Sequence, residues 1–105
     1  MIWIEVVGLH AVLRLKTGFY RTSAYRMEFC PSGLRLAPDD PQDAEILLPA
    51  QDIQSVTLRE KKQPHLEIVC KSGIYEGSFP TAEDSKVALR LLKQNLGAKV
   101  VCVLH

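Results

Sequence analysis

One helix, close to the end of a chain of 105 residues, constrains the fold more than any other feature of this sequence. The stretch TAEDSKVALRLLKQNLG predicts a helix over residues 82–96. Thr81 can cap its start, Asp84 follows at the capping-box spacing, and Gly97 suits its end. Its apolar residues recur at helical spacing and form one face: Val87, Ala88, Leu91, Leu92 and Leu96. That face must be buried, and the rest of the chain offers only a sheet to bury it against.

Short strands joined by turns are predicted everywhere before this helix. The first strand pattern covers residues 2–16, with Gly8 as a bend, and apolar residues occupy alternate positions after it. Six further strand patterns follow, in the stretches YRMEF, LRLA, EILLP, DIQSVTLREKK, LEIVC and IYEGSF. Because most of the connections are short turns, neighbouring strands are expected to pair antiparallel.

Length and composition are those of one ordinary domain. The chain is 47% hydrophobic and 24% charged, which is typical of a globular protein in water. Its formal net charge of +1 provides no overall field that would draw it to nucleic acid or to a membrane. An odd number of widely spaced cysteines, Cys30, Cys70 and Cys102, predicts reduced thiols and a cytoplasmic protein. No apolar run approaches the roughly 20 residues that span a bilayer, and the N-terminus does not read as a signal peptide.

Seven strands followed by one C-terminal amphipathic helix resemble the pleckstrin-homology-like (PH-like) barrel. The stretch from ILLPAQDIQ to RLLKQ, residues 46–94, is similar to the second half of bacterial PH-like and GRAM-type domains. The resemblance implies a mainly β domain over residues 1–105, with a core over about 9–97, extra terminal strands and a helix that closes one end of the barrel. Leu91 or Leu92 should then be fully buried. PH-like domains variously bind phosphoinositides, peptides and other proteins, so the fold alone does not fix the function.

The residues that could carry chemistry lack the spacing that chemistry requires. The three histidines are far apart, and neither a Cys-x-x-Cys nor a His-x-x-x-His pair occurs, so no metal site is predicted. The thiols read as small hydrophobic residues, and no glycine-rich phosphate loop is present. The acids Asp39, Asp40 and Asp43 lie in a loop interrupted by prolines, where solvation is the expected role. The sequence therefore predicts neither an enzyme nor a bound cofactor.

Charge is unevenly distributed along the chain. Residues 14–36 hold five basic side chains and the single acid Glu28, whereas residues 39–52 hold five acids and no base. One interpretation is a basic ligand-binding face formed by Lys16, Arg21 and Arg26, which could bind anionic lipid headgroups at a membrane surface. The other is that neighbouring elements compensate one another's charge. Nucleic acid is disfavoured as a partner because the net charge is low.

The terminal segments MIWIEVV and KVVCVL have the strongest strand patterns and little charge. Both lack alternation, so both faces of each strand should require burial. Either the two termini pair with each other and a second copy covers them, or each tail joins a sheet edge of a neighbouring copy. Both arrangements predict a homo-oligomer with Trp3, Val101 and Val103 in or near the contact. The predicted function is a non-catalytic interaction or assembly module that binds a protein partner or itself, with lipid binding as the alternative.

Overall fold

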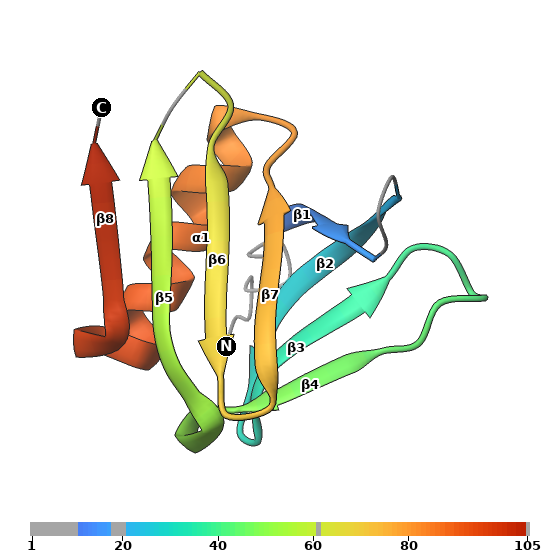
Figure 1. Cartoon of the computed structure of the whole chain (residues 1–105), viewed down its shortest axis with the longest axis horizontal. Coiled ribbons are helices and arrows are strands. Elements are labelled where there is room, and N and C mark those ends of the chain that lie inside the picture. Colours follow the sequence, from blue (N-terminus) through green and yellow to red (C-terminus); the bar gives the residue numbers. More distant parts are fainter. Residues whose placement is uncertain (1–10, 18–20, 61, 105) are drawn as a thin grey trace, which may run out of the picture.

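The computed structural model describes residues 11–17, 21–60 and 62–104, and within them eight strands form one curled sheet in the order β4-β3-β2-β1-β7-β6-β5-β8. Figure 1 shows β5 to β8 running side by side, while β2 to β4 cross them at a steep angle. The strands are β1 (Ala11–Lys16), β2 (Thr22–Cys30), β3 (Gly33–Pro38), β4 (Ile46–Pro49), β5 (Ile53–Glu60), β6 (His65–Cys70), β7 (Gly73–Ser78) and β8 (Val100–Leu104). The helix α1 covers Ala82–Leu96, and the short 3-10 turns η2 and η3 cover Ala50–Asp52 and Gly97–Lys99.

The first seven strands pair antiparallel, as their short connections predicted. Their alternating apolar side chains face inward: Ala11, Leu13 and Leu15 of β1, for example, are each at most 2% exposed. The first strand pattern extended back to residue 2, but its positions before Ala11, including Gly8, lie outside the described residues. The prediction of a mainly β chain closed by a C-terminal helix is confirmed.

The two halves of the sheet meet at one narrow seam. β1 and β7 share only the pairs Arg14 with Ser78 and Leu15 with Gly77. A side chain at Gly77 would place its Cβ 2.6 Å from the carbonyl oxygen of Arg14 and 3.0 Å from a methyl group of Leu13. Glycine is therefore required for the two strands to approach closely enough to pair.

The helix covers the inner face of the sheet. Ala88 and Leu92 are fully buried and Leu96 nearly so, whereas Leu91 is only half-buried. Of the two leucines expected in the closed end, Leu92 alone is fully enclosed. The reason is the direction of the apolar stripe, which places Leu91 at the flank of the helix.

Asp84 fixes the start of the helix to the sheet. The hydroxyl of Thr81 accepts a hydrogen bond from the Asp84 backbone N–H at 3.1 Å and donates to Asp84 Oδ2 at 2.8 Å. The other carboxylate oxygen, Oδ1, accepts the backbone N–H of Val12 in β1 at 3.1 Å. The predicted cap is present, and it also holds the helix against the first strand.

The C-terminal segment has a partner strand that neither expected arrangement included. Residues 100–104 join β5 of their own chain, parallel to it, from the pair Val56 and Val100 to the pair Glu60 and Leu104. Gly97, with φ of 51°, ends the helix, and η3 turns the chain back alongside β5. Lys99 Nζ then donates a hydrogen bond to the carbonyl of Ala50 at 2.8 Å. A helix that ends beside an open strand edge makes this intramolecular pairing possible, and the sequence pattern did not reveal it.

Candidate functional site

The three basic residues of the predicted ligand face lie on or beside β1 and β2. Lys16 ends β1 opposite Thr22, and Arg26 lies four residues further along β2 on the same outer face. At about 3.3 Å per residue, roughly 13 Å separates their positions along the strands. Arg21 is exposed and immediately precedes β2. The three side chains therefore line one side of the molecule without converging on a single point.

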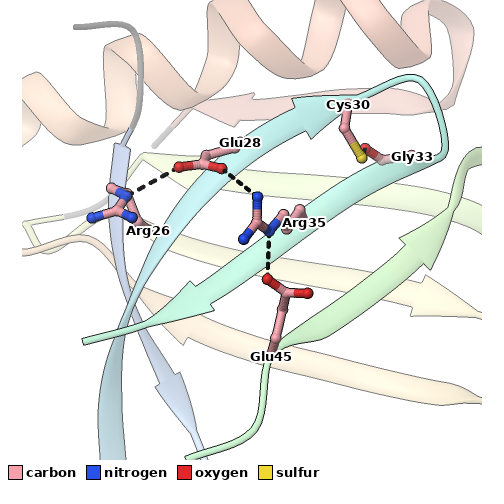
Figure 2. A network of polar contacts seen from close by, with 6 residues as sticks. All are labelled: Arg26, Glu28, Cys30, Gly33, Arg35 and Glu45. Atoms are coloured by element: carbon pink, nitrogen blue, oxygen red, sulfur yellow. Dashed lines mark hydrogen bonds and ion pairs between the residues drawn. The ribbon is translucent and has the colours of Figure 1, made fainter. Parts of the chain in front are cut away.

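Carboxylates accompany most of the basic side chains on this side. Lys16 pairs with Glu76 of β7 at 3.3 Å. Figure 2 shows a chain of ion pairs across β2, β3 and the start of β4, in which Glu28 joins Arg26 at 3.1 Å and Arg35 at 3.6 Å. Arg35 also pairs with Glu45. Exposed pairs of this kind contribute about 0–1 kcal/mol each, and they give this face a mixed charge.

The three cysteines occupy positions typical of structural residues. Cys70 is 5% exposed, and its burial, reinforced by the nearby Asp52, raises the pKa of its thiol. A raised pKa leaves less thiolate, which is the nucleophilic form. Cys30 Sγ lies 3.4 Å from the carbonyl oxygen of Gly33, and Cys102 Sγ lies 3.9 Å from Glu60 Oε2. Among the described residues, no group of three or more histidine, cysteine or acidic side chains could hold a metal ion.

One acid of the proline-broken loop is more buried than its solvated neighbours. Asp39 and Asp40 are exposed, but Asp43 Oδ2 is buried and has no hydrogen-bond partner among the described residues. Its charge acts on Tyr25, whose side chain is 4% exposed. Burial, and to a lesser extent the charge of Asp43, raise the pKa of the Tyr25 phenol. The loop is tied to β2 by the backbone N–H of Asp39, which donates to the carbonyl oxygen of Ala24 at 3.0 Å.

The two edges of the sheet are protected very differently. β4 has four residues, ends at Pro49, which lacks an N–H group, and adjoins the Arg35–Glu45 ion pair. β8 has five residues with no charge and no proline. Figure 1 shows β8 as the outermost strand on its side of the sheet, beyond β5. A row of backbone groups on its outer edge therefore has no partner among the strands that the structure describes.

The predicted interface residues Val101 and Val103 both belong to this edge. Val100 and Cys102 pack against the core, so the alternate residues Val101 and Val103 face outward, and Val101 is 50% exposed. Trp3, the third residue of the prediction, lies outside the described residues. Sequence reasoning missed two other exposed apolar side chains, Leu47 at 47% and Ile74 at 61%. Leu47 follows Ile46 and Ile74 precedes Tyr75, so each adjoins another apolar residue within a short strand, and no sequence signal separated it from core residues.

No helix within the described part of the chain is both long enough and apolar enough to cross a membrane.

No protein-family model and no curated protein sequence matches the chain. Solved structures do match, among them a chain in the structure of the Spt16D Pob3N heterodimer. That chain superimposes with a TM-score of 0.64 at 16% sequence identity, over 90% of the present chain and 52% of its own length. The present chain thus spans about half of that protein. At this identity the likeness concerns the fold alone, and together with the strand order and the closing helix it shows that this chain has the PH-like fold.

Proposed function

We propose that this chain is a non-catalytic, protein-binding domain of the cytoplasm that uses the β8 edge as its binding surface. The observation that supports the proposal most strongly is the uncharged edge strand, in which Val101 is half exposed and the outer backbone groups have no partner among the described strands. Within the PH-like fold we assign the chain to the bacterial PH-like or GRAM-type group, on the likeness of residues 46–94.

An uncovered strand edge can bind a protein segment by adding a strand to the sheet. The backbone hydrogen bonds supply affinity, and the outward side chains at alternate positions supply specificity. Soluble proteins usually block such edges with charge, proline or a bulge, because open edges aggregate. β4 has a proline and an adjacent ion pair, whereas the five residues of β8 include neither a charge nor a proline. The difference indicates that β8 has a partner in the working protein.

The comparison with solved structures is compatible with this role, since the matching chain was solved as part of a heterodimer. No metal or cofactor is required. Backbone hydrogen bonds and apolar contacts are sufficient to bind the proposed partner.

Binding of anionic lipid headgroups is the second candidate. Arg14 and Arg21 are exposed and have no acidic partner within the described residues, which favours a basic surface. Lys16 and Arg26, however, already face carboxylates. A headgroup would have to displace Glu76 and Glu28 from them, which makes this role the weaker of the two.

A matched pair of variants tests the protein-binding role. Val101→Lys places a charge at the β8 edge, and Ile74→Lys places the same charge on a residue that is at least as exposed but lies within β7, an inner strand. Immobilised wild-type protein and both variants are incubated with extract of the source cells plus a tagged second copy, and the captured proteins are quantified. The proposal expects at least tenfold loss of a captured protein with Val101→Lys and little change with Ile74→Lys. Equal capture by all three proteins would overturn it.

The lipid role has its own test, in which phosphatidylserine vesicles are mixed with the protein at low and physiological salt. Salt-sensitive binding that Arg21→Glu removes would support it, because headgroup attraction is screened by ions. Absence of vesicle binding at low salt would exclude it.

A further inference from the structure

We propose that the partner at the β8 edge is a second copy of this chain, paired antiparallel about a two-fold axis that passes beside Cys102. The proposal rests on the proposed function, because it requires β8 to be the binding edge. It adds the identity of the partner, the direction of its strand and the register of the pair.

The absence of charge in β8 favours a second copy. In a two-fold antiparallel pair the residue on the axis faces its own copy, so a charge there would oppose a like charge, whereas a wholly apolar strand fits its own sequence at every position. The five residues of β8 are three valines, one cysteine and one leucine. An edge adapted to a different protein would have no need to avoid charge, and opposite charges on that partner would improve specificity.

The alternation of side chains in β8 limits the register. Val101 and Val103 face outward, whereas Val100 and Cys102 face the core. Two strands continue the same sheet only if outward residues lie opposite outward residues. Pairing Cys102 with Cys102 of the second copy satisfies this condition and overlaps the strands along their whole length. The neighbouring allowed registers, centred on Val101 or Val103, overlap only three residues of each strand.

In this register Val101 lies opposite Val103 of the second copy. Each such pair extends a row of side chains that runs from strand to strand across the outer face of the sheet. Val101 is beside Thr57 of β5, and Thr57 is beside Glu67 of β6. The two-fold axis stands perpendicular to the joined sheet, so both α1 helices lie on the same side of it. Five residue pairs bury less than the roughly 1,200 Å² of a standard interface, so the dimer should dissociate in a range on the order of micromolar.

The oligomeric state of the protein in solution tests the proposal directly. In reducing buffer, the light-scattering mass of the full chain should rise from the protomer value of 11.8 kDa toward twice that value as its concentration reaches high micromolar. Val101→Lys should weaken the dimer at least tenfold, because it buries a lysine against valine. Ile74→Lys should leave it unchanged. Thermal melts of both variants verify that the protomer remains folded.

A double variant tests the register. In V101K/V103E the introduced lysine faces the introduced glutamate of the other copy on both sides of the axis, so dimerisation should recover relative to Val101→Lys alone. A register centred on residue 101 would instead place lysine against lysine. Failure to recover would therefore overturn the proposed register.

Oxidation gives an independent measurement. Directly opposed residues of an antiparallel pair have Cα atoms about 4.5–5.5 Å apart, within the range of about 4.4–6.8 Å that a disulfide spans. In the Cys30→Ser variant, diamide should accept two electrons and two protons from a pair of Cys102 thiols and leave a covalent dimer. Adding Cys102→Ser should abolish it.

A protein that stays monomeric at high micromolar concentration overturns the second copy as partner. If Val101→Lys still removes a different captured protein, the proposed function survives that result. A dimer that Val101→Lys does not weaken would mean that another surface joins the copies, and the assignment to β8 would be wrong.

Discussion

Replacing Leu92 with alanine tests whether the helix completes the core. Leu92 is fully buried where α1 covers the inner face of the sheet. The substitution removes three carbons, and at about 0.8 kcal/mol per buried methylene the transfer loss alone is roughly 2.4 kcal/mol. The cavity that remains adds to this, so the expected loss of unfolding free energy is about 2–5 kcal/mol. A domain of this size has roughly 5–15 kcal/mol of stability in total, so the effect is large.

Leu91 provides the matched control, because it is the same residue type in the next position of the same helix but is only half-buried. Leu91→Ala leaves no enclosed cavity and should cost roughly 1 kcal/mol. Both free energies can be measured by urea denaturation followed by circular dichroism, with equal m-values required for the comparison. A loss below about 0.5 kcal/mol at Leu92, or equal losses at the two positions, would mean that the helix does not close the barrel.

Three further changes test other features of the fold. Gly77→Ala should destabilise the protein by about 1–3 kcal/mol in urea denaturation, because its Cβ would lie 2.6 Å from the Arg14 carbonyl oxygen. An unchanged denaturation midpoint would contradict the close approach of β1 and β7 at this position. Tyr25 has a raised pKa, so its neutral phenol stabilises the fold below the ordinary value of 10.0, and this contribution is lost as the pH rises through the higher folded value. The Tyr25→Phe variant should therefore lose less unfolding free energy than the wild type between pH 9 and 11 in the same assay. If the free energies of the two proteins fell in parallel over this range, ionisation of Tyr25 would not be the cause of the loss. Asp84→Ala should cost about 1–2 kcal/mol, because the helix loses a cap and Val12 loses its acceptor, and a neutral result would mean that water replaces both.

The regular elements followed from local patterns. Alternation of apolar side chains identified the inward faces of β1 and β2, and Pro49 marked the end of β4. Thr81 and Gly97 marked the two ends of the helix. These features depend on the period of a strand or a helix and on backbone dihedral preferences, which a few adjacent residues determine.

The candidate site was identified only in part from the sequence. The composition of residues 100–104 predicted a strand that needed partners, and Val101 and Val103 were singled out on that ground. The sequence did not reveal that β8 joins β5 of its own chain, nor that β8 then forms one edge of the sheet that the structure describes. A strand pattern indicates that residues require neighbours, but the choice among the available edges depends on the whole sheet.

Tertiary structure also decided contacts for which a linear sequence has no signal. One carboxylate oxygen of Asp84 accepts a hydrogen bond from the backbone N–H of Val12, 72 positions away, because this N–H group of β1 lies beside the start of the helix. No sequence pattern singled out Gly77, because its need for glycine arises from the close approach of β1. Leu91 and Leu92 are equivalent in composition, yet their burial differs because the sheet covers only one side of the helix. Local periodicity determined which elements form, and packing among residues distant in the chain determined where each one lies and which edge remains open.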